Sequence, residues 1–152
     1  MRQARTLYNE GVSYALSMYV AGVSVECFLR AYKMLRDKTF DERHDLRRLF
    51  KASGMLSVDP AVLRARGLTE SQINDHHCDL QTALADVYKL WSNEYRFASE
   101  DRLRVHLKSR ILDRRTKGDL LKDNALALLN AAQTFHDKGI FLWLSSKKSN
   151  RS

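Results

Sequence analysis

The segment from Arg102 to Lys117 holds the densest set of side chains able to bind a phosphate group. Arg102, His106 and Arg110 recur at every fourth position, so on a helix they form one row. The other cations lie on adjacent faces or continue the segment: Arg104, Lys108, Arg114, Arg115 and Lys117. Because Lys and Arg bind nucleic acid through its phosphates, we expect RNA binding that weakens steeply with salt. The alternative is a solvated helix anchored by Leu103, Leu107 and Ile111.

A second set of chemistry-bearing residues is spread along the chain and consists of Glu26, His44 and Arg96. Glu26 interrupts the apolar stretch from Met18 to Ala31, and His44 opens the next predicted helix. A carboxylate in an apolar helix is costly to bury unless it is paired, and Arg96 or His44 would supply a partner. We expect a buried polar cluster that holds three helices in register. The alternative is an active site in which His44 acts as an acid or base near neutral pH.

Histidine and cysteine occur together at His76, His77 and Cys78, between two aspartates. Adjacent residues on a helix point in different directions, whereas zinc needs ligands that converge from spaced positions. Cys27 and Cys78 lack a paired metal or redox spacing, so we expect two reduced thiols in the core. The sequence therefore predicts no metal site and no cofactor.

Three aromatic residues precede the basic segment: Trp91, Tyr95 and Phe97. Aromatic side chains stack on bases in proteins that bind single-stranded nucleic acid. The same residues at helical spacing also suit a core, and this is the role we expect for them.

The net charge of +8 at pH 7 makes an acidic partner plausible, and nucleic acid is one such partner. A charged content of 29% with a hydrophobic content of 44% is typical of a folded domain. A bilayer-spanning helix takes about 20 apolar residues, and the chain has no such stretch. We expect a cytoplasmic protein that does not enter a membrane.

Apolar residues at spacings of three and four predict helices along most of the chain. A single proline and six glycines leave little punctuation for many short strands. The predicted helices cover residues 1–10, 14–37, 42–53, 69–95, 100–115 and 119–144, with a short helical turn after Asp59 and Pro60. The sequence predicts an all-α bundle of four to five main helices in one domain, residues 1–144, followed by a basic disordered tail, residues 145–152.

Three motifs in order resemble those of the HEPN family of small α-helical domains. The first is the helix Tyr19-Val20-Ala21-Gly22-Val23-Ser24-Val25-Glu26-Cys27-Phe28-Leu29-Arg30-Ala31, which resembles the family's Tyr-Leu-Ala-Gly-Tyr-Ala-hydrophobic-Glu-x-x-Leu-Lys-Ala pattern. The second is His44-Asp45-Leu46-Arg47-Arg48-Leu49, similar to Gly-His-x-Leu-x-x-Leu. The third runs from Trp91 to Arg96, with Phe97 where the family often has Tyr.

The resemblance implies a helical bundle, a homodimer, and association with RNA or nucleotides. Many HEPN proteins are metal-independent ribonucleases or toxins paired with nucleotidyltransferase antitoxins, and others are inactive binding modules. The family's catalytic signature is an Arg, four to six residues, then a His. No histidine of this chain has an Arg at that spacing, and Arg102 and His106 have only three residues between them.

From the resemblance and the charge pattern we expect an RNA- or protein-partner-binding module of a toxin–antitoxin or phage-defence system, degenerate at the ribonuclease motif. One alternative is a metal-independent endoribonuclease in which Arg102 and His106 form a shifted catalytic pair. Another is a non-catalytic subunit that partners a nucleotidyltransferase.

Overall fold

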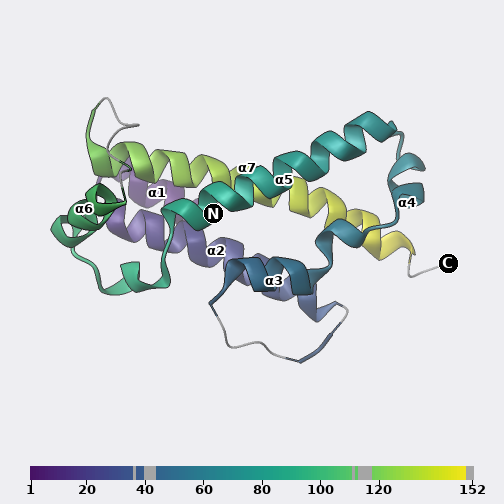
Figure 1. Ribbon diagram of the computed structural model, residues 1–152, viewed down its shortest axis with the longest axis horizontal. Helices are drawn as coiled ribbons and strands as arrows, with labels where there is room; N and C mark the ends of the chain where they lie inside the picture. The colour runs from purple at the N-terminus through teal and green to yellow at the C-terminus, as the bar shows by residue number, and fades with distance from the viewer. Residues whose placement is uncertain (36, 40–43, 111, 113–117, 150–152) are drawn as a thin grey trace. The chain divides into compact units, whose positions relative to one another are not determined.

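The computed structural model describes residues 1–35, 37–39, 44–110, 112 and 118–149, with no account of the side chains of residues 146–149. No β-strand occurs within these ranges, so the predicted all-α class is confirmed for them (Figure 1). The α-helices of the described residues are α1 (Arg2–Glu10), α2 (Tyr14–Met34), α3 (Leu46–Ser53), α4 (Pro60–Arg64), α5 (Glu70–Leu90), α6 (Glu100–Ser109) and α7 (Leu120–Ser149). Two 3-10 helices, η1 (Met55–Ser57) and η2 (Asn93–Phe97), lie between them.

The chain divides into two compact units. Unit 1 comprises Met1–Ser24 and Asp86–Gln133, and unit 2 comprises Val25–Ala85 and Thr134–Ser152. Seven α-helices in the described part of the chain exceed the predicted four to five main helices, so the HEPN-like bundle stays a prediction. The single domain over residues 1–144 also stays a prediction, since two compact units can belong to one domain.

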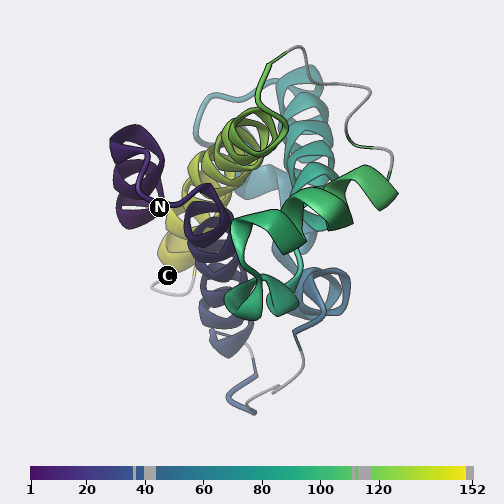
Figure 2. The ribbon, with the colours of Figure 1, turned by 90° about the vertical axis from the view of Figure 1, so that its left-hand side faces the viewer.

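Unit 1 packs α6 next to the N-terminal part of α2, and Figure 2 shows these segments in green and dark purple. The backbone N–H of Tyr14, at the start of α2, donates to Glu100 Oε1 at 2.8 Å. Leu103 and Leu107 of α6 are buried in the core of this unit. These contacts hold α6 by one side and leave its charged side chains outside.

A glycine in α2 is needed for the packing of Trp91 in unit 1. A Cβ added at Gly22 would lie 2.1 Å from Trp91 Cδ1, far inside van der Waals contact. The Trp91 side chain is 6% exposed, and its Nε1–H donates to the Tyr19 carbonyl at 3.2 Å. The indole ring therefore lies directly against the α2 backbone, and a larger residue at position 22 would displace it.

Unit 2 is built around aromatic side chains of α2, α3 and α7. Phe28 lies 6.3 Å from Phe135, and Phe50 lies 6.1 Å from the same ring. A Cβ at Gly139 would lie 2.4 Å from Phe28 Cε1, so α7 approaches this ring closely. Figure 1 shows α3 alongside the C-terminal half of α2, where the Glu26–His44 contact described below joins the two segments.

Predicted helix ends agree with the structure at Gly11, Gly54 and Asp59. Gly11 and Gly54 adopt left-handed conformations (φ 65° and 60°) immediately after α1 and α3. Asp59 caps α4, with Pro60 at its first position. The helix predicted to begin at residue 42 instead begins at Leu46, because Asp45 accepts hydrogen bonds from the backbone N–H groups of residues 47 and 48.

Three other predicted helix ends are wrong. The helix predicted over 100–115 ends at Ser109, with Arg110 as its C-cap. The helix predicted over 69–95 ends at Leu90, and Ser92 caps η2 by accepting the Glu94 backbone N–H. At the other end, α7 continues through Ser149, past the predicted tail start at residue 145. Ser145 is fully buried and donates its hydroxyl to the Phe141 carbonyl, which lets a polar residue remain inside the helix. Of the described helices, none combines the length and apolar character needed to cross a bilayer.

Candidate functional site

A pocket of about 360 Å³ opens in unit 1 where η2 meets α6. Ser99 separates the two elements and caps α6 by accepting the Arg102 backbone N–H at 3.3 Å. This cap fixes where α6 begins, and so fixes which of its residues face η2. The lining residues are Glu94, Tyr95, Phe97, Ala98, Arg102, Leu103 and His106.

Arg102 and His106 both line this pocket, as neighbours four apart on α6. The prediction that they share a helical face is confirmed, while their catalytic role stays a prediction. Within the described part of the chain, no ion pair or hydrogen bond engages the Arg102 guanidinium. The His106 ring packs edge-on against Tyr95, with centroids 5.8 Å apart, and its buried Nε2 has no hydrogen-bond partner there.

The three aromatic residues differ in their surroundings. Trp91 and Tyr95 are 6% and 4% exposed, as expected for core residues, whereas Phe97 is 72% exposed. The Arg96 guanidinium lies 4.3 Å from the centroid of the Phe97 ring, within cation–π range. Phe97 therefore presents an aromatic surface beside the pocket.

Tyr95 forms part of the inner wall of the pocket. Burial raises the pKa of its hydroxyl above the ordinary value of 10.0, and the Glu94 carboxylate raises this pKa further. The Arg110 guanidinium opposes both effects. The hydroxyl is therefore neutral at physiological pH.

The other members of the predicted basic row are placed differently. Arg104 forms an ion pair with Asp119, with Nη2 and Oδ2 2.8 Å apart. This hydrogen bond is the main reason that the pKa of Asp119 is lowered and that of Arg104 raised. Lys108 and Arg110 are exposed, while Arg114, Arg115 and Lys117 lie outside the described residues. Of the described members of the basic row, Arg102 and His106 line the pocket.

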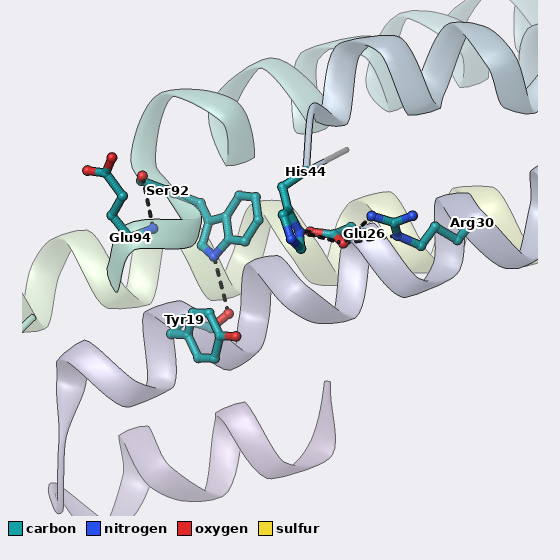
Figure 3. Close-up of polar contacts among 7 residues, drawn as sticks. Tyr19, Glu26, Arg30, His44, Ser92 and Glu94 are labelled. Atoms are coloured by element: carbon teal, nitrogen blue, oxygen red, sulfur yellow. Dashed lines mark hydrogen bonds and ion pairs between the residues drawn. The ribbon is translucent and has the colours of Figure 1, made fainter. Parts of the chain in front are cut away.

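A separate polar cluster in unit 2 surrounds Glu26, which is 5% exposed. Arg30 Nε and Nη2 lie 3.0 and 2.9 Å from Glu26 Oε1. His44 Nδ1 lies 3.0 Å from both carboxylate oxygens. Figure 3 shows His44 and Arg30 approaching the carboxylate from opposite sides. Glu26 and His44 are thus brought together as predicted.

The guanidinium that contacts Glu26 belongs to Arg30, one helical turn later on α2. Sequence reasoning missed Arg30 in this role, although the four-residue spacing was a usable signal. Arg96, the predicted third member, is exposed and stacks on Phe97. Because Arg96 belongs to unit 1 and the other two to unit 2, the three-residue cluster stays a prediction.

The histidine–cysteine segment of α5 does not resemble a metal site. No cluster of three or more His, Cys, Asp or Glu ligands occurs in the parts of the chain that the structure describes. His76 is buried, with Nε2 2.9 Å from the Lys138 carbonyl oxygen, and burial lowers its pKa. Cys27 and Cys78 are free thiols, but both are exposed, so their predicted place in the core is wrong.

Of the pocket residues, sequence reasoning singled out neither Ala98 nor Glu94, and Glu94 carries a charge. Glu94 is exposed, and among the described residues no hydrogen bond or ion pair engages its carboxylate. Its backbone N–H donates to Ser92 Oγ, as Figure 3 shows, so the cap of η2 sets its position. A lone Glu in a polar stretch carries no distinguishing pattern, and only the fold identifies it as part of the pocket.

Comparison with known proteins gives no further guide to this site. No protein-family model, no curated protein and no solved structure matches the chain.

Proposed function

We propose that the protein binds single-stranded RNA at the pocket between η2 and α6. The observation that carries the proposal is that one 360 Å³ pocket is lined by an exposed aromatic ring, Phe97, and by Arg102, whose guanidinium no other described residue engages, with His106 beside them. Such a volume lies near the lower end for ligand sites, which suits one nucleotide of a strand. This function deepens the expectation of an RNA-associated module.

Phe97 supplies the stacking surface in this proposal. Its side chain is 72% exposed, and the Arg96 guanidinium packs 4.3 Å from the ring centroid. A base stacked on the ring would form a layer with both side chains. Stacking of this kind contributes about 1–3 kcal/mol per base, or about 5- to 150-fold in Kd.

Arg102 supplies the phosphate contact. Its guanidinium is exposed and has no competing carboxylate partner among the described residues, unlike that of Arg104. A guanidinium binds two phosphate oxygens at once, which positions the strand without reading its sequence. His106 lines the same wall, where its ring packs edge-on against Tyr95.

The test is fluorescence anisotropy with a labelled single-stranded RNA dodecamer across a range of salt concentrations. Phe97→Leu should weaken binding severalfold, whereas Phe97→Tyr, which keeps the ring, should bind like the unaltered protein. Arg102→Gln should reduce the slope of log K against log salt by about 0.7, the value for one phosphate of a single strand.

Lys122→Gln is the matched control, because Lys122 is also an exposed cation of unit 1 but does not line the pocket. If Lys122→Gln reduced affinity as much as Arg102→Gln, binding would depend on net charge alone. If neither Phe97→Leu nor Arg102→Gln changed the affinity, the pocket would not be the RNA site.

A second candidate function is RNA cleavage by Arg102 and His106. The observation that favours it is that both side chains line one pocket. His106 would transfer a proton while Arg102 stabilised charge on the phosphate. Incubating RNA with the protein in the presence of a chelator tests it, with His106→Ala as the control. Cleavage that persists in His106→Ala would exclude this pair as the catalyst.

A further inference from the structure

The carboxylate of Glu94 is the feature of this pocket that phosphate binding leaves unexplained. Glu94 lines the pocket together with Arg102, yet no ion pair joins them among the described residues. In a chain of net charge +8, a carboxylate beside a phosphate site would weaken binding by repulsion. If the carboxylate instead accepts hydrogen bonds from the base, its negative charge has a favourable partner.

An ionised carboxylate only accepts hydrogen bonds, and it offers two oxygens side by side. Among the four RNA bases, guanine alone presents two adjacent donors, N1–H and the 2-amino group, on its Watson–Crick edge. Adenine and cytosine each place a donor beside an acceptor on that edge, and uracil places one donor between two carbonyl oxygens. Single-stranded RNA exposes these edges to side chains.

The surroundings of Glu94 fit a stacked base. Phe97 is three residues further along η2 and lines the same pocket, so a base on its ring would direct one edge towards the pocket wall. Glu94 precedes Tyr95 in η2, and both residues line the pocket. The position of Glu94 is set by the Ser92 cap, which accepts its backbone N–H at 3.3 Å.

We propose that the pocket selects guanine, with Glu94 accepting hydrogen bonds from N1–H and the 2-amino group of a base stacked on Phe97. This inference rests on the proposed RNA-binding function and adds a base preference to it. Glu94 is a specificity-determining residue, while Phe97 and Arg102 supply the affinity that all bases share.

Four labelled RNA dodecamers test the preference by fluorescence anisotropy at one low salt concentration. One is oligo-uridine, and the others carry a single central guanosine, inosine or adenosine. Guanosine should bind about tenfold more tightly than uridine or adenosine, the low end for a bidentate contact at an exposed site. Inosine keeps N1–H but lacks the 2-amino group, so its affinity should be intermediate.

Glu94→Gln should remove the guanosine preference and leave the affinity for oligo-uridine within about twofold. Asp101→Asn is the matched control, because Asp101 is an exposed carboxylate on α6 that does not line the pocket, and it should keep the preference. Circular dichroism on each variant establishes that the fold is intact.

Equal affinity of the unaltered protein for all four RNAs would overturn the guanine inference and leave RNA binding standing. A Glu94→Gln variant that bound all four more tightly by the same factor would also overturn it, since the carboxylate would then only repel phosphate. Failure of every RNA to bind would overturn the proposed function and this inference together.

Discussion

In unit 2 the ring of His44 lies 3.0 Å from both oxygens of the Glu26 carboxylate, whereas in unit 1 the ring of His106 has an Nε2 with no partner among the described residues. The two histidines also differ in their carboxylates. Glu26 is buried and contacted from two sides, while Glu94 is exposed at the edge of a pocket.

The Glu26–His44 cluster is an example of polar groups that stabilise a fold, whereas the pocket of unit 1 holds polar groups that are available to a ligand. A buried carboxylate with its oxygens satisfied has little capacity left for a new hydrogen bond, and its loss is costly. A pocket lined by an exposed guanidinium that no other described residue engages has capacity for one. We therefore propose that the Glu26 cluster serves stability and that the η2–α6 pocket serves binding, and the predictions below test that proposal.

The largest effect is expected from Glu26→Ala, which leaves the Arg30 guanidinium, 12% exposed, without its carboxylate. Breaking a buried ion pair costs about 3–5 kcal/mol of unfolding free energy. Urea unfolding measures this loss. His44→Ala is the comparison variant and should cost about 1 kcal/mol, because the side chain is 48% exposed. A smaller loss for Glu26→Ala than for His44→Ala would contradict the structural role of the cluster.

Gly22→Ala tests whether the core of unit 1 around Trp91 is tightly packed. The new methyl group would meet Trp91 Cδ1 at 2.1 Å, and overpacking of this kind costs about 1–3 kcal/mol. Gly118→Ala is the control in the same unit, since its Cβ would meet only Asp123 Oδ2 at 3.5 Å, an ordinary contact. Thermal unfolding compares the midpoint temperatures of the two variants, and similar midpoints would mean that the indole moves freely.

Phe97→Leu should separate binding from stability. With the side chain 72% exposed, the change in unfolding free energy should stay within about 0.5 kcal/mol, although RNA affinity falls. Chemical unfolding and anisotropy on the same preparation measure both. A loss of stability as large as that of Gly22→Ala would place Phe97 among the structural residues instead.

The smallest effect is expected from an exposed group of unit 2, Asp37. Its pKa is lowered from 3.8 to about 2, first by the Thr39 side-chain hydrogen bond, then by the Thr39 backbone and by Lys33. A lowered folded-state pKa contributes stability above pH 3.8 that is lost as the pH falls towards 2. Asp37→Asn should therefore flatten the acid side of the stability profile over this window. Parallel profiles for the two proteins would show that the contact contributes nothing.

Local signals in the sequence were sufficient for most of the fold. Helical periodicity, the glycines at 11 and 54 and the Asp59-Pro60 pair identify helices and ends that the structure contains. The end of α5 was missed because Trp91 and Tyr95 continue the apolar rhythm beyond Leu90, and periodicity cannot distinguish a 3-10 helix that buries the same residues.

The candidate site was predicted only in part, for a physical reason. The shared face of Arg102 and His106 follows from helical spacing, which is local. The arrangement of Glu94 and Phe97 beside them depends on how η2 folds back against α6, which no single spacing encodes. The predicted partners of Glu26 were Arg96 or His44. His44 does contact it, whereas the guanidinium beside it belongs to Arg30, at the spacing that helices favour.

The packing of Trp91 has a spectroscopic consequence. The chain has two tryptophans, and Trp91 belongs to unit 1 while Trp143 belongs to unit 2. Trp91 is 6% exposed with its N–H bonded to a carbonyl, whereas Trp143 is half-buried and 5.5 Å from the ring of Tyr32. Each unit thus carries its own intrinsic fluorophore, and Trp→Phe variants would let the emission of one unit be followed without that of the other.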